Sequence, residues 1–409
     1  PTDDSVYEGN ETAGISVSGV SGGGASENGT QAVTITITDN ESAPTVTLAT
    51  SATSIAENAG SSLTLTATLS VATTADVTVA LSTSGTATEG TDYTDGSGVV
   101  NDITISAGST TGTVNFTPTD DSVYEGDETA TIAVSGVSGG SATESGSQSV
   151  TITITENESA PTVTLTTSAT SIAENAGSSL TLTATLSTAT TADVTVTIGT
   201  AGTATEGTDY TDGSGNLDDI TISAGATTGT VSFTPTDDAS DPVYEENETA
   251  IISIDGVSGG SASESGSQSV TITITENESA PTVTLTRSAA SIAENSGSTV
   301  TITATLSIKV DEAVTVALST SGAATEGTDY GTISDITVSA GATTGTATFD
   351  PTDDSVYEDD EAATIAIDSV SGGGASESGS QSVAVTITEN ESEPTVTLAT
   401  SATSIAENA

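Results

Sequence analysis

Residues 63–69 read Leu63-Thr64-Leu65-Thr66-Ala67-Thr68-Leu69, so that apolar and polar side chains alternate along the whole segment. Residues 150–154 alternate in the same way. A period of two places the apolar side chains on one face of a strand, which is typical of an antiparallel sheet with one buried face. Low complexity and high net charge favour disorder, but this alternation instead predicts a folded all-β chain.

The pattern recurs along the chain in step with a proline that stands beside an acidic stretch. The prolines are Pro1, Pro118, Pro235 and Pro351, which gives a period of about 117 residues, the size of one β-sandwich domain. We therefore predict an array of domains within the 409 residues. The predicted units are a partial module over 1–43, complete modules over 44–160, 161–280 and 281–393, and the first strand of a further module over 394–409.

Seven strands are predicted in the first complete module, and no helical periodicity competes with them. In chain order, strands A to G are expected at 44–55, 62–70, 76–84, 102–106, 111–117, 128–135 and 148–155. Seven short strands separated by turn signals are typical of an immunoglobulin-like sandwich. The predicted fold class is therefore all-β, a tandem array of immunoglobulin-like seven-stranded β-sandwiches.

All the aromatic residues fall on repeat-equivalent positions. They form three sets: Tyr7, Tyr124, Tyr244 and Tyr357; Tyr93, Tyr210 and Tyr330; Phe116, Phe233 and Phe349. A sugar-binding face normally needs additional exposed rings, and none is left over for one here. We therefore expect the rings to be core anchors of their own modules.

The chain carries 57 acidic residues against Lys309 and Arg287 alone, a formal net charge of −55. Such a charge repels nucleic acid phosphates and anionic membranes, so we exclude both as partners. Cys, His, Met and Trp are absent, which removes disulfides, thiol and imidazole nucleophiles and the commonest zinc ligands. No apolar run approaches the roughly 18 residues of a membrane span. We expect neither an enzyme nor direct membrane insertion in this segment.

The acidic residues concentrate in one class of loop. If each strand runs the full height of the sandwich, the A–B, C–D and E–F connections and the exit after strand G lie at the same end. In the first complete module these segments carry Glu57, Glu89, Asp92, Asp95, Asp120, Asp121, Glu125, Glu156 and Glu158. Converging carboxylates need a counter-ion, and Ca²⁺ accepts about six to eight oxygen ligands in flexible geometry. The alternative is that these acids are only solvated surface residues, but a solvated surface gives no reason for the acids to concentrate at one end.

Four separated motifs resemble the Calx-beta domain, which occurs in sodium–calcium exchangers and large microbial surface proteins. In the first complete module they lie at 54–58, 90–93, 119–128 and 153–158, in the same order. The resemblance covers every complete module and both partial ones. It implies Ca²⁺ as the bound ion. The exchanger has three consecutive aspartates where this chain has Glu156-Asn157-Glu158, and a further aspartate at Ser122, which implies fewer or weaker ions here.

The resemblance also implies which residues bind Ca²⁺. In the partial first module and the first complete module they are Asp3, Asp4, Glu8, Asp39, Glu41, Glu57, Asp92, Asp120, Asp121, Glu125, Glu128, Glu156 and Glu158. In the second complete module they are Glu174, Asp209, Asp237, Asp238, Glu245, Glu276 and Glu278. In the third and the final partial module they are Glu294, Asp329, Asp353, Asp354, Glu358, Glu389, Glu391 and Glu407.

The functional expectation is an extracellular structural protein, a stalk or filament of a bacterial surface adhesin or appendage that Ca²⁺ stiffens at each joint. Only residues 156–161 separate one module from the next, so neighbouring modules of the same chain are expected to stack end to end. Regulatory Ca²⁺-sensor domains of a larger membrane or signalling protein are the alternative. Identical subunits could also exchange terminal strands to form a filament, the alternative being a segment cut from a longer array.

Overall fold

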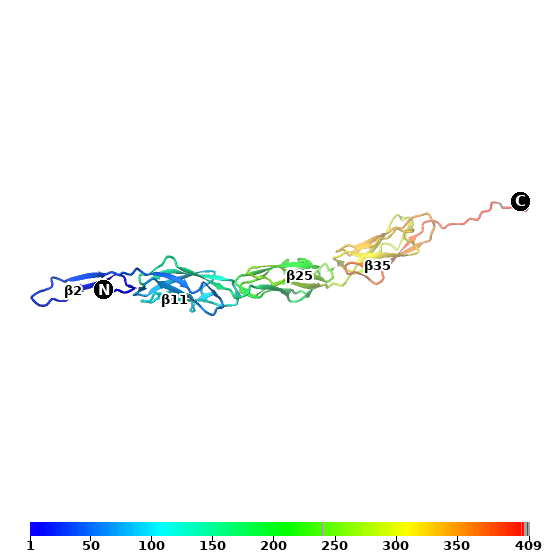
Figure 1. The fold of residues 1–409 in the computed structure, drawn as a ribbon. Helices are drawn as coiled ribbons and strands as arrows, with labels where there is room; N and C mark the ends of the chain where they lie inside the picture. Colours follow the sequence, from blue (N-terminus) through cyan, green and yellow to red (C-terminus); the bar gives the residue numbers. More distant parts are fainter. Residues whose placement is uncertain (239, 402, 405–406, 408–409) are drawn as a thin grey trace.

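The computed structural model describes residues 1–409 except 239, 402, 405–406 and 408–409. Three sandwiches follow one another in an elongated row, with a hairpin before the first and an extended segment after the third (Figure 1). Apart from a short 3-10 turn at Glu294–Ser296, the described residues form strands, turns and loops. No helix in this described part is long and apolar enough to cross a membrane. The fold is an all-β tandem array, as predicted.

The first sandwich consists of two five-stranded sheets, in the orders β14-β4-β6-β11-β9 and β10-β8-β13-β15-β5. Its strands are β4 (Thr45–Thr50), β5 (Ser54–Ala56), β6 (Leu63–Leu69), β8 (Val77–Gly85), β9 (Tyr93–Thr94), β10 (Ile103–Ile105), β11 (Thr111–Pro118), β13 (Glu128–Ser138), β14 (Thr143–Glu144) and β15 (Ser149–Thr155). β13 runs beyond the predicted end at 135, because a bulge between Val134 and Gly136 lets its pairing with β8 continue.

The prediction of one strand over 44–55 is wrong. β4 pairs antiparallel with β6 in one sheet, whereas β5 pairs parallel with β15 in the other. Between them the Thr50 hydroxyl donates to the Ala52 carbonyl at 2.9 Å and closes the turn that carries the chain across the sandwich. Leu48 and Ile55 therefore enter the same core from opposite sheets, and both are buried.

The second sandwich repeats this arrangement, and the third does so with one four-stranded sheet, β34-β30-β28-β36, because Tyr330 forms only isolated bridges there. The second contains β16 (Thr162–Thr167), β17 (Ser171–Ala173), β18 (Leu180–Leu186), β20 (Val194–Gly202), β21 (Tyr210–Thr211), β22 (Ile220–Ile222), β23 (Thr228–Pro235), β25 (Glu248–Ser258), β26 (Ser263–Glu264) and β27 (Ser269–Thr275). The third contains β28 (Thr282–Arg287), β29 (Ser291–Ala293), β30 (Val300–Leu306), β32 (Val314–Gly322), β33 (Ile336–Val338), β34 (Thr344–Phe349), β35 (Glu361–Ser371), β36 (Ser376–Glu377) and β37 (Ser382–Thr388).

One stacked pair of rings lies at the centre of each core. In the first sandwich the Tyr93 and Phe116 ring centroids are 4.6 Å apart, and neither side chain is exposed. The pairs Tyr210–Phe233 and Tyr330–Phe349 repeat this distance. The surrounding core is built from Val, Ile, Leu and Ala. These two sets of rings are the core anchors that the repeat pattern predicted.

Replacing Phe116 by Ala should destabilise the first sandwich by about 3–5 kcal/mol, because the change removes a buried ring, leaves a cavity and ends the stacking with Tyr93. Urea unfolding should then show an early transition for this sandwich, since Phe233 and Phe349 are unchanged in the other two. Val99→Ala is the matched control, because Val99 is 54% exposed in the same sandwich and should change stability by less than about 0.5 kcal/mol. Equal effects of the two variants would contradict the assigned core.

The remaining tyrosines lie at the joints. β12 (Val123–Tyr124) pairs parallel with β19 (Ala189–Thr190) of the second sandwich, and β24 (Val243–Tyr244) pairs with β31 (Lys309–Val310) of the third. At the start of the chain, β1 (Val6–Tyr7) pairs with β7 (Ala72–Thr73) of the first sandwich.

The prediction that these tyrosines anchor their own cores is therefore wrong. Tyr7, Tyr124 and Tyr244 are half-buried between units, and Tyr244 packs against the core of the sandwich that follows it. Tyr357, in the equivalent loop of the third sandwich, is also half-buried and donates to Asp359 at 2.9 Å. These tyrosines lie outside the cores because the loop that carries each of them projects away from its own sandwich.

The two ends of the chain lie outside complete sandwiches. β2 (Glu11–Ser16) and β3 (Ala32–Ile37) form an antiparallel hairpin equivalent to β13 and β15. Its apolar side chains are exposed, including Ile15 at 55% and Ile35 at 50%. In the first sandwich the equivalent Ile132 and Ile152 are fully buried, because a second sheet covers them.

Candidate metal centre

The predicted convergence of acidic loops is present at one end of each sandwich. In the first, Glu57 follows β5, Asp92 precedes β9, Glu125 follows β12, and Glu156 and Glu158 follow β15. Carboxylate oxygens of Glu57, Glu156 and Glu158 lie within 4.8 Å of one another. A second triad with the same spacing is formed by Asp92, Glu125 and Glu128. We call this end of each sandwich the acidic end.

The second sandwich repeats both groups. Glu174 approaches Glu276 and Glu278 on one side and Asp237 and Asp238 on the other, again within 4.8 Å. The second triad consists of Asp209, Glu245 and Glu248. Glu248 is absent from the predicted set although it is the repeat equivalent of Glu128, so repeat alignment would have found it.

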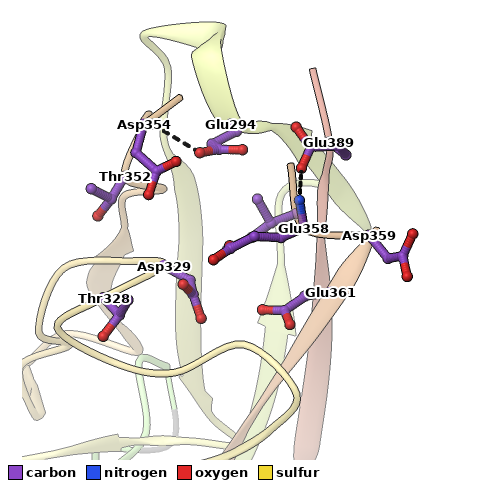
Figure 2. Close-up of a pocket in the computed structure, with 10 residues that line it drawn as sticks. Glu294, Thr328, Asp329, Thr352, Asp354, Glu358, Asp359, Glu361 and Glu389 are labelled. Atoms are coloured by element: carbon purple, nitrogen blue, oxygen red, sulfur yellow. Dashed lines mark hydrogen bonds between the residues drawn. The ribbon is translucent and has the colours of Figure 1, made fainter. Parts of the chain in front are cut away.

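The third sandwich gathers the equivalent side chains around a small cavity (Figure 2). Glu294 follows β29, Asp329 lies between β32 and β33, and Glu361 begins β35. Glu358 and Glu389 complete the ring with Asp354, whereas the Asp359 side chain points away from it (Figure 2). The cavity has a volume of about 10 Å³, about the space of one water-sized sphere. Glu361, like Glu248, is a lining residue that the sequence prediction missed.

Several predicted residues lie at the edge of these groups or outside a complete sandwich. Asp120 and Asp353 are exposed. Side-chain hydrogen bonds with Glu156 and Glu389 are the main cause of the raised pKa values of Glu158 and Glu391, and the charges of Asp120 and Asp353 add to the effect. In the partial module, Asp3, Asp4, Glu8, Asp39 and Glu41 line one hollow, which lacks the loops equivalent to those of Glu57 and Asp92. Glu407 is exposed on the segment after the third sandwich.

Two other acids of the C–D segment maintain the loop structure. Glu89 accepts hydrogen bonds from the Val100 backbone N–H at 2.6 Å and from the Thr83 hydroxyl at 2.8 Å. Asp95 accepts hydrogen bonds from Ser97 and Asn101 in the same segment. Because these carboxylates accept hydrogen bonds from within the segment, they stabilise the loop that carries Asp92.

A carboxylate after the last strand organises the rim of each acidic end. Glu156 accepts hydrogen bonds from the backbone N–H groups of Glu125, at 2.6 Å, and Gly126, at 2.9 Å. Burial alone would raise the pKa of Glu156, but these hydrogen bonds and that from the Glu158 N–H lower it to about 2. Glu389 makes the equivalent contact with the Glu358 N–H at 2.5 Å (Figure 2). This carboxylate is therefore ionised at neutral pH.

Several other glutamates of these groups have raised pKa values. Burial, followed by repulsion from Glu156 and Glu158, raises the pKa of Glu57 to about 7. Burial, followed by the charge of Asp92, raises the pKa of Glu128 to about 7. In the second sandwich, burial and Asp209 raise the pKa of Glu248 to about 8. Without a cation, these groups hold protons near neutral pH because burial, and then repulsion between the ionised forms, disfavours the charged carboxylates.

The donor set fits a hard divalent cation. Five buried carboxylate oxygens have no hydrogen-bond partner within the described residues: Glu128 Oε2, Glu158 Oε2, Asp238 Oδ1, Glu278 Oε2 and Glu391 Oε2. A buried, unpaired carboxylate oxygen is costly unless a cation or a proton compensates it. All the converging ligands are oxygens, which Ca²⁺ and Mg²⁺ prefer to nitrogen or sulfur.

A sequence model of the Calx-beta domain matches residues 39–158, 156–278 and 276–392. The chain belongs to the Calx-beta domain family. The matched segments include all three acidic ends, so the groups described above are those of three tandem Calx-beta repeats. No curated protein sequence matches the chain.

Similar solved structures include CBD12 from CALX1.2, which is 15% identical over 56% of this chain and 99% of that chain, with a TM-score of 0.24. The apo-form Calx CBD1 domain is 20% identical over 27% of this chain and 99% of that chain, with a TM-score of 0.24. Invasin, titled a bacterial integrin-binding protein, is 18% identical over 79% of this chain and 56% of that chain, with a TM-score of 0.28. Likenesses at this level carry no functional argument.

Proposed function

We propose that these Calx-beta repeats form an extracellular stalk or filament segment of a bacterial surface protein, in which Ca²⁺ bound at each acidic end stiffens the joint to the next sandwich. The observation that carries the proposal is the position of β12. This two-residue strand lies between Asp121 and Glu125, and it pairs with β19 of the following sandwich. The loop that would bind the ion is therefore the loop that makes the joint.

Hydrogen bonds connect carboxylates of the acidic end to the backbone of β12 at the joint. Asp121 Oδ1 accepts from the Val123 N–H at 2.7 Å, and Glu156 Oε2 accepts from the Glu125 N–H at 2.6 Å. Both ends of β12 are thus held by carboxylates of the candidate centre. An ion that fixes these carboxylates would also hold β12 in the position that pairs with β19, whereas repulsion between them would loosen it.

The residues that would hold the ion are the carboxylates gathered at each acidic end. They are the groups described above for the first two sandwiches, and Glu294, Asp329, Asp354, Glu358, Glu361 and Glu389 in the third. Ca²⁺ would supply charge neutralisation and coordination of the unpaired carboxylate oxygens. Extracellular Ca²⁺ modules bind at about 10⁻⁴ to 10⁻³ M, which supports a site filled outside the cell and empty inside it. We propose a structural role and no catalysis, because the same acidic groups recur in every repeat with no unique reactive residue.

The proposed partners are the neighbouring repeats of the same chain. Strand exchange between identical subunits stays a prediction. The hairpin β2–β3 and the segment 394–409 correspond to strands F, G and A of a sandwich. Joining two copies by these ends would therefore leave the positions of strands B to E unfilled, and the hairpin's apolar face would stay largely uncovered.

Small-angle X-ray scattering of the chain tests the joint directly. With Ca²⁺ we expect the large maximum dimension of a straight row, and after chelation a smaller and less defined dimension, because the joint between the first and second sandwiches bends. Mg²⁺ at the same concentration is the control, and it should be less effective because it keeps its own waters. An identical scattering profile with and without Ca²⁺ would refute ion-controlled stiffness.

Glu361→Gln should separate metal binding from electrostatic strain in the third sandwich. Repulsion from Asp329 accompanies burial in raising the pKa of Glu361, so the neutral amide should stabilise the metal-free form. The same change should weaken Ca²⁺ binding by at least about tenfold, because a ligand charge is lost. Calorimetric titration and thermal melting in EDTA measure the two effects.

Asp368→Asn is the matched control for that variant. Asp368 lies on the same strand, β35, is exposed, and carries the same charge. It should leave both Ca²⁺ affinity and metal-free stability nearly unchanged. If both variants weaken binding equally, net charge rather than coordination explains the affinity.

A further inference from the structure

The joint between the second and third sandwiches differs from the joint before it in both of its surfaces. On the second sandwich, three additional residues lengthen the loop before β24 and bring in Asp241. On the third, Lys309, Val310 and Gly374 stand where the second has Ala189, Thr190 and Ser261. These differences all lie in segments that face one another across this joint.

The first matched contact is an ion pair. Lys309 Nζ lies 2.6 Å and 2.7 Å from the two carboxylate oxygens of Asp241. It is the one ion pair among the residues that the structure describes, and Lys309 is the only lysine of the chain. Lys309 also forms part of the parallel ladder, as the partner of Val243. The chain's single ammonium group is therefore placed at a joint, opposite an acid that only this repeat's insertion supplies.

The second matched contact is steric. A Cβ atom built at Gly374 would lie 2.7 Å from Tyr244 Cε1 and 3.0 Å from Glu246 Oε1 of the preceding sandwich. Tyr244 packs against the core of the third sandwich beside Val310, which is fully buried. Ser141 and Ser261 occupy the position of Gly374 in the other two sandwiches, with a similar positive φ of 52°. Serine thus fits the loop itself, but at this joint it would displace the tyrosine.

These contacts discriminate between repeats more than they stabilise the fold. Lys309 is 33% exposed and Asp241 75% exposed, so the ion pair is weak in absolute terms. Specificity, however, depends on the difference in interaction free energy between two partners. A repeat with Ala at position 309 and Ser at position 374 would leave Asp241 unpaired and crowd Tyr244. The surrounding charge increases the difference, because Glu246 on one side and Asp311 and Glu312 on the other would face each other with no cation.

We propose that the acidic end of the second sandwich and the Lys309–Gly374 face of the third form a matched interaction surface, which selects this repeat as its neighbour without a metal ion. The partner that this surface fits is a Calx-beta repeat with lysine at position 309 and glycine at position 374. The docking geometry of this joint is then specified by its own side chains. This inference does not depend on Ca²⁺ binding.

Distance measurements between paired labels test the proposal in the whole chain. The chain has no cysteine, so introduced cysteines carry spin labels at chosen sites only. Thr104, Thr221 and Thr337 are exposed at equivalent central positions of β10, β22 and β33. The pair Thr221→Cys and Thr337→Cys reports on the matched joint, and the pair Thr104→Cys and Thr221→Cys reports on the preceding joint as an internal control.

The informative variants introduce, at positions 309 and 374, the residues that the second sandwich carries at the equivalent positions. Lys309→Ala and Gly374→Ser, in EDTA, should broaden or shift the distance distribution of the matched joint and leave the control joint unchanged. For Lys309→Ala the docked population should fall by up to about fivefold relative to the undocked one. Raising the salt from about 0.1 M to about 1 M should mimic this variant. The double exchange Asp241→Lys with Lys309→Asp should restore the original distances.

Two results would overturn the proposal. One is an unchanged distribution at the matched joint in both variants, and the other is an equal change at both joints. Both variants place residues that this fold accommodates in the other repeats, and a retained circular dichroism spectrum confirms that each variant folds. A loss of every Ca²⁺ effect would refute ion-controlled stiffness while leaving the matched joint intact, so the two proposals fail separately.

Discussion

Saturating Ca²⁺ should raise the free energy of unfolding of each sandwich by about 2.7 kcal/mol for every site filled at about one hundred times its dissociation constant. For sites with a dissociation constant of about 10⁻⁴ M, this requires about 10 mM Ca²⁺. The physical reason is that the unfolded chain does not assemble the carboxylates of the acidic end, so the ion binds the folded state alone. The melting temperature should rise by roughly 10 °C.

Differential scanning calorimetry measures this effect, and ionic strength is its main confounder. With a net charge of −55, any salt screens repulsion within the chain. The control is therefore NaCl at the same ionic strength, which should give a much smaller rise. If NaCl matches Ca²⁺, the acidic ends are solvated surfaces rather than coordination sites. The Glu361→Gln variant should reduce the rise for the third sandwich alone.

The metal-free chain should become more stable as the pH falls from about 8 to about 5, which is the reverse of the usual behaviour of paired carboxylates. The folded-state pKa is raised to about 7 for Glu57, Glu128 and Glu174, and to about 8 for Glu248. Unfolded glutamates titrate near 4.3. Between these values the folded state holds protons that the unfolded state has released, so stability falls as the pH rises through this window.

Ca²⁺ should reverse this dependence. The ion replaces the protons, so stability with Ca²⁺ should fall as the pH drops below about 7 and protons compete for the carboxylates. Binding near pH 6.5 should release protons, which calorimetry in buffers of different ionisation enthalpy detects. Melting temperatures of Ca²⁺-free protein at several pH values give the metal-free curve. A metal-free stability that rises steadily from pH 5 to pH 8 would contradict the raised pKa values.

The position of the acidic loops could be predicted because it depends on strand count alone. An odd number of strands precedes each acidic loop, so Glu57, Asp92 and Glu156 had to reach the same end whatever the details of packing. Glu248 and Glu361 were missed although Glu128 was predicted, since the repeat equivalence was not carried through. Glu89 and Asp95 are in the same segment as Asp92, but hydrogen bonds within the loop direct them elsewhere.

The alternation of apolar and threonine residues by itself determined the all-β class, because it depends on a local period of two. The spacing of about 117 residues determined the repeat and the core positions of rings such as Tyr93 and Phe116, but their stacking is a tertiary contact. Only the tertiary structure decided the crossing of β4 to β5 and the contacts at the joints. β12 and β19 are two residues long and distant in sequence, so no periodicity marks them. Tyr124 and Tyr244 look like core residues of their own repeats. They lie between repeats because the adjacent sandwich provides the surface that covers them.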